Sequence, residues 1–311
     1  MGRYILGRLL SLVFVLFAVS LIAFLLMHAV PGGPFDIGER RLPEATRMAQ
    51  MEKYGLNEPL YEQYLRYMWH AVRLDFGVPF QRPTETVTGL IASRWPVTIA
   101  IGIPTIIIAY TFGTLLGVIA ATRQNSWIDY LVTTVGTLGL TVPSWVIGTW
   151  LVLMLSVRWD LLPTGGWGEP KHYIMPVIAY SLAPMALVAR YTRLTLIETM
   201  RSDYVRTARA KGLNEKRIMA GHIARNAAIP WVTVLLPEIP NILTGSIFIE
   251  AIFNIPGLGS YFVTSTISRD YPMILALTLL IAALWGVTYL ITDLLYTVLD
   301  PRVRLVGGRV G

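Results

Sequence analysis

The sequence predicts an all-α integral membrane protein with six transmembrane helices, a small helical extracytoplasmic insertion after the first helix and a long cytoplasmic loop after the fourth. Three observations support this prediction. Hydrophobic residues make up 54% of the 311 residues and charged residues only 14%, whereas about a quarter of an ordinary soluble domain is charged. The apolar residues gather in long runs. The basic residues cluster in a few of the segments between these runs.

Six apolar runs are long enough to cross about 30 Å of hydrocarbon, which takes roughly 20 helical residues. They cover residues 9–30, 97–121, 130–157, 172–189, 231–252 and 272–299. An even number of spans places both termini on the same side of the membrane. Prolines interrupt these runs, and each proline removes a backbone donor and bends or breaks its helix. They are Pro104, Pro143, Pro176, Pro184, Pro237 and Pro240.

The distribution of basic residues predicts the orientation. They precede the first span, lie in the second connection and follow the last span, as Arg3, Arg8, Arg123, Arg302, Arg304 and Arg309. Nine more lie between Arg190 and Arg225. By the positive-inside rule these segments and both termini face the cytoplasm. The connection of residues 31–96 carries eight basic and eight acidic residues, and a loop of this length is translocated regardless of its charge. We expect it outside the cell.

The first apolar run has a competing interpretation as a cleaved secretory signal peptide, because Arg3 and Arg8 form a positive n-region. The run is too long for this, and no small-x-small cleavage site follows it before Pro31. We therefore expect an uncleaved first span.

The outer connection is predicted to fold. Residues 43–54 and 59–73 have the pattern of two helices, with Gly55 placed to end the first. Apolar residues of the second fall on one stripe, namely Leu60, Tyr64, Leu65, Met68, Trp69 and Val72. A third amphipathic stretch, residues 84–95, either lies along the membrane surface before the chain re-enters at Pro96 or packs the outer helices onto the bundle.

Ionisable side chains are rare in the spans, where the main ones are Glu238, Glu250 and Asp293. Proton-coupled carriers and ion channels usually bury several such groups, so both classes are disfavoured. Polar residues flank the prolines at two places, and these are the candidates to line a pathway: Thr141, Ser144, Glu238 and Asn241. Simple structural kinking is the competing interpretation of these prolines.

Gly113 and Gly117 predict a close approach between helices.

No enzyme motif is present in the sequence. There is no phosphate-binding Gly-x-x-x-x-Gly-Lys-Ser/Thr loop, no His-Glu-x-x-His and no Gly-x-Ser-x-Gly. The sequence has no cysteine, and its four histidines are far apart, so no metal site and no cofactor of its own are expected. In a membrane protein the location of the charges matters more than their sum, so the net charge of +7 does not indicate a nucleic-acid partner.

The loop of residues 190–230 is the most distinctive segment. Its pattern predicts a helix over residues 194–210 that ends at Gly212, and a second helix after Asn214 that contains Ile218 and Ile223. From spacing alone, two interpretations remain open. The helices form either an amphipathic hairpin on anionic lipid head groups or a docking element for another protein.

The segment Arg206-Thr207-Ala208-Arg209-Ala210-Lys211-Gly212-Leu213 resembles the cytoplasmic signature loop of ABC importer permeases, in the form of the dipeptide/oligopeptide/nickel branch. Ala208 and Gly212 keep the second alanine and the glycine of the general loop, whereas Arg206 and Thr207 replace its first two positions. Other matching segments extend along nearly the whole chain. They are Ala224-Arg225-Asn226-Ala227-Ala228-Ile229-Pro230, Pro31-Gly32-Gly33-Pro34, Tyr54-Gly-Leu-Asn-Glu-Pro59 with Gln63-Tyr64, Asp75-Phe76-Gly77, Thr141-Val-Pro-Ser144, Phe253-Asn-Ile-Pro-Gly-Leu-Gly259 and Leu299-Asp-Pro-Arg302.

The resemblance implies a permease subunit in a bacterial-type inner membrane that forms half of a pathway for di- or oligopeptides. Its implied partners are a second, homologous permease, two ATPase subunits that bind ATP and Mg, a substrate-binding protein and membrane lipid. The outer insertion resembles that of the first permease of such a pair. A stand-alone proton-coupled peptide carrier is the alternative, and a channel or a membrane anchor would be further possibilities on composition alone.

The resemblance also assigns the coupling helix that would seat in an ATPase. Its residues are Asp203, Tyr204, Arg206, Thr207, Ala208, Arg209, Ala210, Lys211, Gly212 and Leu213. The expected organisation is a stub and first span (residues 1–30), the insertion (31–96), the transporter domain (97–299, with the coupling loop at 190–230) and a cytoplasmic tail (300–311).

Overall fold

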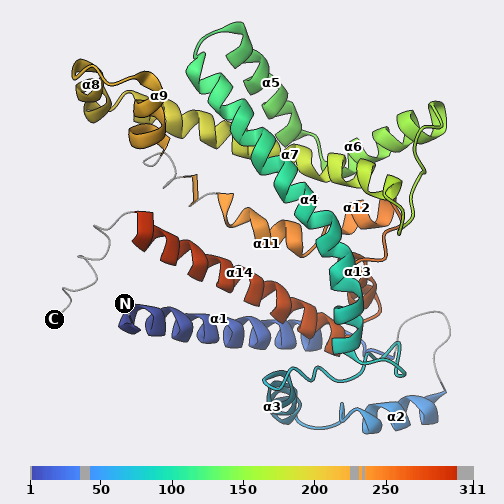
Figure 1. Ribbon diagram of the computed structural model, residues 1–311. Helices are drawn as coiled ribbons and strands as arrows, with labels where there is room; N and C mark the ends of the chain where they lie inside the picture. Colours follow the sequence, from blue (N-terminus) through green and yellow to red (C-terminus); the bar gives the residue numbers. More distant parts are fainter. Residues whose placement is uncertain (1, 36–42, 225–230, 233–234, 300–311) are drawn as a thin grey trace. The chain divides into compact units, whose positions relative to one another are not determined.

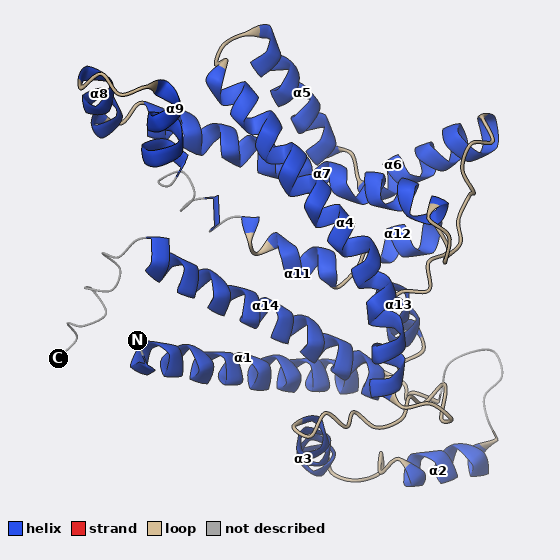
Figure 2. Ribbon diagram, in the orientation of Figure 1, coloured by secondary structure: helices blue, strands red, loops and turns tan. Residues whose placement is uncertain are grey.

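The computed structural model describes residues 2–35, 43–224, 231–232 and 235–299. Helices and loops make up the whole of this described part, as Figure 2 shows. The chain divides into two compact units, one made of residues 1–97 and 257–286 and the other of residues 98–256 and 287–311.

The first unit contains α1 (Gly2–Ala29), α2 (Glu44–Lys53), α3 (Leu60–Ala71), α13 (Leu258–Ile267) and the first parts of α4 (Val87–Thr122) and α14 (Tyr271–Leu299) (Figure 1). The second contains the rest of α4 and α14 with α5 (Trp127–Thr141), α6 (Ser144–Leu151), the π-helix η1 (Val152–Arg158), α7 (Lys171–Met200), α8 (Asp203–Ala210), α9 (Glu215–Ile218), the π-helix η2 (Met219–Ile223), α11 (Glu238–Leu243) and α12 (Ile247–Ile252).

Four described helices are long and apolar enough to cross a membrane: Ile5–Ala29 of α1, α4, α7 and Tyr271–Leu295 of α14. The predicted third span is wrong as a single helix. It is a pair, Trp127–Thr141 and Ser144–Arg158, bent by 96°. Pro143 precedes α6 with extended backbone (φ −58°, ψ 140°) and cannot donate a hydrogen bond to α5, so the chain turns there.

The predicted fifth span lies partly outside the described residues. Its described part forms α11 and α12, which are separated by Gly245 at φ +91°. This left-handed backbone conformation suits glycine and interrupts a helix. The count of six spans therefore stays a prediction.

The helix predicted over residues 194–210 is also wrong as one element. α7 continues to Met200 and α8 begins at Asp203. Ser202 between them has an extended backbone (ψ 150°), and its hydroxyl donates to the carbonyl oxygen of Thr199 at 2.6 Å. The Ser202 amide donates to the same carbonyl oxygen at 3.1 Å, so Ser202 caps the end of α7 with both its amide and its hydroxyl. The break sets α8 apart as a separate short helix.

The amphipathic stretch of residues 84–95 packs rather than lying alone on a surface. Its larger part is the beginning of α4, which runs through Pro96 without a break. Val87 and Leu90 are buried in one cluster with Leu258 and Met273. These contacts show that the stretch packs onto α13 and α14, and its position relative to the membrane surface stays a prediction.

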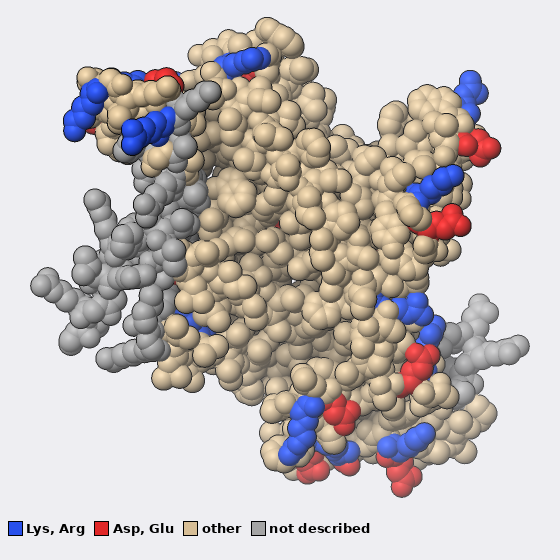
Figure 3. All heavy atoms as spheres, viewed as in Figure 1, with Lys and Arg blue, Asp and Glu red and all other residues tan. Residues whose placement is uncertain are grey.

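The two predicted helices of the insertion are confirmed as α2 and α3, and Gly55 follows α2 at φ +65°. Hydrogen bonds, among them the following two, join this region to the turn before α14. Arg269 Nη1 donates to the Pro31 carbonyl at 2.8 Å, and the Gln81 amide donates to Asp270 Oδ2 at 3.2 Å. Figure 3 shows charged side chains of both signs over α2 and α3.

The predicted close approach at Gly113 and Gly117 is confirmed. A Cβ atom at Gly113 would lie 2.7 Å from the carbonyl oxygen of Met185, and one at Gly117 would lie 2.6 Å from that of Ala189. Both oxygens belong to α7. The two glycines therefore let α4 and α7 meet backbone to backbone.

Candidate functional site

Helix α8 is held by its apolar side. Val205 and Ala208 are buried, and they share a hydrophobic cluster with Ala121 of α4, Leu196 of α7 and Ile218 of α9. These contacts bring together residues that are far apart in the sequence. They fix α8 directly onto the ends of two long helices, so a displacement of α8 has to displace its neighbours or break the cluster.

The opposite side of α8 and the turn after it are exposed. Of the residues predicted to couple to an ATPase, only Ala208 is buried and only Leu213 is half-buried. The others are open to solvent: Asp203, Tyr204, Arg206, Thr207, Arg209, Ala210, Lys211 and Gly212. Figure 3 shows basic side chains gathered over the α8–α9 hairpin. This hairpin therefore offers a polar, mostly basic surface on a well-packed base.

Gly212 shapes the turn as predicted. Its φ is +74°, a conformation that side chains with a Cβ rarely adopt. The amide of Leu213 donates to the Ala208 carbonyl (3.3 Å), and the amide of Gly212 donates to the Arg209 carbonyl (2.9 Å). These two bonds form the Schellman motif that ends many helices.

An ion pair spans this turn. Arg209 Nε lies 2.7 Å from Glu215 Oε1, and its Nη2 lies 3.4 Å from Oε2. The hydrogen bond from Arg209 lowers the pKa of Glu215, so the pair persists until the pH falls below the usual range of a glutamate. Exposed pairs add little stability, but this one joins the two helices of the hairpin.

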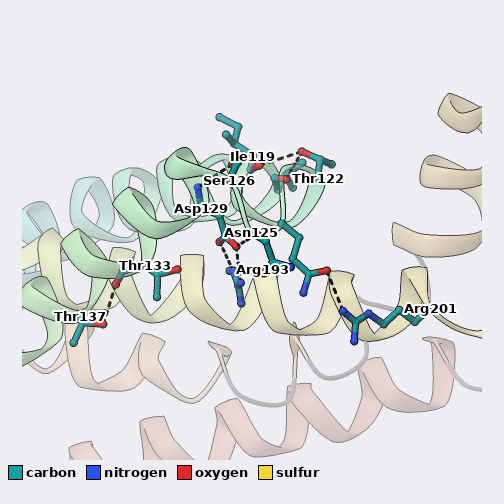
Figure 4. A network of polar contacts seen from close by, with 11 residues as sticks. Ile119, Thr122, Asn125, Ser126, Asp129, Thr133, Thr137, Arg193 and Arg201 are labelled. Atoms are coloured by element: carbon teal, nitrogen blue, oxygen red, sulfur yellow. Dashed lines mark hydrogen bonds and ion pairs between the residues drawn. The ribbon is translucent and has the colours of Figure 1, made fainter.

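A second ion pair, which the sequence analysis missed, lies between α5 and α7 (Figure 4). Arg193 donates to Asp129 from Nε at 2.5 Å and from Nη2 at 2.7 Å. Asp129 also accepts from the Asn125 amide at 2.9 Å, and its own amide donates to Ser126 Oγ. The Ser126-x-x-Asp129 spacing of a helix start was readable in the sequence. Its partner, 64 positions away, was not.

Three of the four candidate pathway residues come together. Ser144, Glu238 and Asn241 line one cavity of about 240 Å³. Its other lining residues are Leu140, Tyr180, Ala183, Pro184, Leu187 and Ile242. Thr141 is not among them, and its hydroxyl donates to the Thr137 carbonyl at 2.8 Å within α5.

Hydrogen bonds order the polar part of this cavity. Asn241 Nδ2 donates to Glu238 Oε2 at 3.3 Å, and the Tyr180 hydroxyl donates to the Asn241 carbonyl at 3.0 Å. Glu238 is half-buried. Glu250, in contrast, is buried and accepts a hydrogen bond from Thr98 at 2.8 Å, which is a packing role.

Comparisons with known proteins agree along the whole chain. Residues 113–305 match the family described as binding-protein-dependent transport system inner membrane component, and residues 1–102 match the N-terminal part of the membrane component of such systems. The dipeptide transport system permease protein DppB of Bacillus subtilis (strain 168) is 37% identical over 305 residues, which cover 98% of this chain and 99% of that protein. The oligopeptide transport system permease protein OppB of Salmonella typhimurium is 39% identical over 306 residues, 98% of this chain and 100% of that protein.

A solved structure shares the fold. The MetNI methionine ABC transporter, determined in inward-facing conformations, contains a chain that matches with a TM-score of 0.55 at 15% identity. The match covers 68% of this chain and 96% of that one. The family match and the two full-length relatives show that this chain belongs to the binding-protein-dependent transport system inner membrane component family, the permeases of ABC importers.

Proposed function

We propose that this chain is one of two permeases in an ATP-driven peptide importer, that it lines half of the pathway and that α8 is the helix that couples it to ATP hydrolysis. The partners are a homologous permease, two ATPase subunits that carry the ATP and Mg, and a binding protein that delivers the peptide. The two relatives named as dipeptide and oligopeptide permeases support peptides as the substrate class. We also propose that the chain spans the inner membrane several times and that both of its termini lie in the cytoplasm.

The packing of α8 is the single observation that carries the coupling role. Its buried face contacts α4 and α7 through Val205 and Ala208, while its other face is free for a partner. A movement of an ATPase subunit that holds the exposed face would then reach both long helices as one body. The close α4–α7 contact at Gly113 and Gly117 passes the movement along the bundle.

The cavity that contains Ser144, Glu238 and Asn241 is our candidate for a part of the pathway. It lies where α6, α7 and α11 meet, next to the sharp bend between α5 and α6. Irregular helix ends are tolerated at membrane depth where they line a cavity. A movement passed from α8 to α7, whose residues line this cavity, would change the opening of this space.

Replacing Gly212 with valine tests the coupling role. Valine is strained at a φ of +74°, so the end of α8 should change while the buried face, which Gly212 does not touch, keeps its packing. We expect normal insertion, with peptide uptake greatly reduced and ATP hydrolysis no longer stimulated by the loaded binding protein. Reconstituted proteoliposomes allow both rates to be measured on the same sample.

Two variants serve as controls. Gly212→Asn should keep most of the coupling, because asparagine tolerates left-handed backbone better than valine does. Gly168→Val introduces comparable strain (φ +106°) in the loop before α7 and should leave coupling intact. Full uptake by Gly212→Val, or equal loss in both valine variants, would rule out the special role of this turn.

Single cysteines test the pathway, since the chain has none of its own. We expect Ser144→Cys and Asn241→Cys to react with a small water-soluble thiol reagent, and transported peptide to slow the reaction. Ser156→Cys is the control, because Ser156 is buried and does not line the cavity. No reaction at Ser144→Cys and Asn241→Cys, with and without nucleotide, would remove this cavity from the pathway.

A further inference from the structure

Helix α3 has more apolar surface than its packing uses. Tyr64 and Ala71 are buried, and Tyr64 shares a small cluster with Phe24 and Leu275. A second row of apolar residues recurs at spacings of four, four and three, which places it on one side of the helix. This exposed stripe consists of Tyr61 (64% exposed), Leu65 (63%), Trp69 (65%) and Val72 (79%).

The contacts of Tyr64 fix the depth of α3 along the first span. Its hydroxyl lies 2.8 Å from Ser20 Oγ, and its ring packs edge-on against Phe17 and Phe24. The apolar segment Ile5–Ala29 is about 37 Å long at 1.5 Å per residue, slightly more than the roughly 30 Å of hydrocarbon. Ser20 lies about 14 Å along the helix from Ala29. The contact between Tyr64 and Ser20 therefore lies inside the hydrocarbon region, below the level of the head groups and the water.

The direction of α3 suits a position in the membrane plane. Figure 1 shows α1 lengthwise and α3 nearly end-on, so α3 crosses the first span instead of running beside it. A helix that crosses a span near one end, at this depth, lies along the boundary between head groups and acyl chains. Amphipathic helices at such a boundary bury their apolar side by about 5–10 Å.

The polar groups of α3 agree with this placement. Gln63, Arg66 and His70 lie on the side away from the exposed stripe, where Gln63 bonds to the Leu56 and Glu58 carbonyls and Arg66 pairs with Glu58. At the edge of the stripe, the Arg73 guanidinium lies over the Trp69 ring at 3.7 Å. Tryptophan and tyrosine are typical of the membrane interface. Arginine is found there as well, with its guanidinium extended toward the water.

We propose that α3 is an interfacial helix whose exposed stripe contacts the lipid of the leaflet around the Ala29 end of α1. Lipid is the occupant that the depth requires, because the stripe sits beside a span whose own residues Ile22, Leu25 and Leu26 are also exposed. The insertion is then anchored to the bilayer and to α1 at the same time. This inference needs α1 to cross the membrane but does not depend on α8 or on the transported substrate.

Spin labels on single cysteines test this directly. Leu65→Cys places the label on the exposed stripe, where truncation removes no buried contact, and His70→Cys places it on the polar side of the same helix. The full chain, produced together with its transport partners, is reconstituted in lipid nanodiscs. We expect collisions with oxygen to exceed collisions with a water-soluble nickel chelate several-fold at Leu65→Cys, with the opposite order at His70→Cys.

Two results would overturn the proposal. A Leu65→Cys label that collides mainly with the nickel chelate would place the stripe in water. A label there that is immobilised and shielded from both oxygen and nickel would show that a protein partner, and not lipid, covers it. Because Leu65 is exposed, purification of the variant as a folded chain is expected in every case.

Discussion

Replacing Arg193 with alanine is expected to destabilise the protein by about 3–5 kcal/mol. The reason is that Asp129 would lose its partner. The Asp129 side chain is only 3% exposed and accepts two hydrogen bonds from Arg193, so its charge would remain buried without a cation. Removing one member of a buried ion pair costs far more than the pair itself contributes.

The measurement is the temperature at which the detergent-solubilised, fluorescently tagged chain is lost from its size-exclusion peak. Arg201→Ala is the matched control, because Arg201 is exposed and bonds only weakly to Gln124 at 3.2 Å, so its midpoint should hardly move. The double variant Asp129→Asn with Arg193→Gln removes both charges and should recover most of the loss. A double variant as unstable as Arg193→Ala would show that charge burial is not the cause.

Replacing Gly117 with alanine is the second large effect that we expect, a loss of roughly 3 kcal/mol. The added Cβ would lie 2.6 Å from both the Ala189 carbonyl oxygen and the Thr192 Cβ. Neither neighbour is the flexible end of a side chain, so α4 and α7 have to separate. In the assembled transporter this separation should also lower uptake, because the same contact joins the helices that hold α8.

Gly136→Ala provides the matched comparison for thermal stability. Gly136 lies in α5 and also faces α7, but its added Cβ would meet only the Ala186 Cβ at 4.0 Å, an ordinary contact. Alanine favours a helix more than glycine does, so this variant should be as stable as the parent or slightly more stable. Equal melting temperatures for the two alanine variants would contradict the close-contact explanation.

Much of the local structure was determined by the sequence alone. Long apolar runs predicted α1, α4, α7 and α14, because a spanning helix has to be apolar over its length. Gly212 predicted the turn after α8 since few other residues adopt its backbone conformation. The signature around Ala208 and Gly212 predicted the family, which full-length relatives then confirmed.

Contacts between distant segments were decided only by the tertiary structure. The bond between Asp129 and Arg193 joins two helices whose sequences contain no trace of the pairing. Whether Pro143 bends a span gently or breaks it by 96° depends on what α6 packs against, as does the separation of α7 from α8 at Ser202. Sequence patterns report which face of a helix is apolar, but the choice of partner for that face comes from packing, which is a property of the folded chain as a whole.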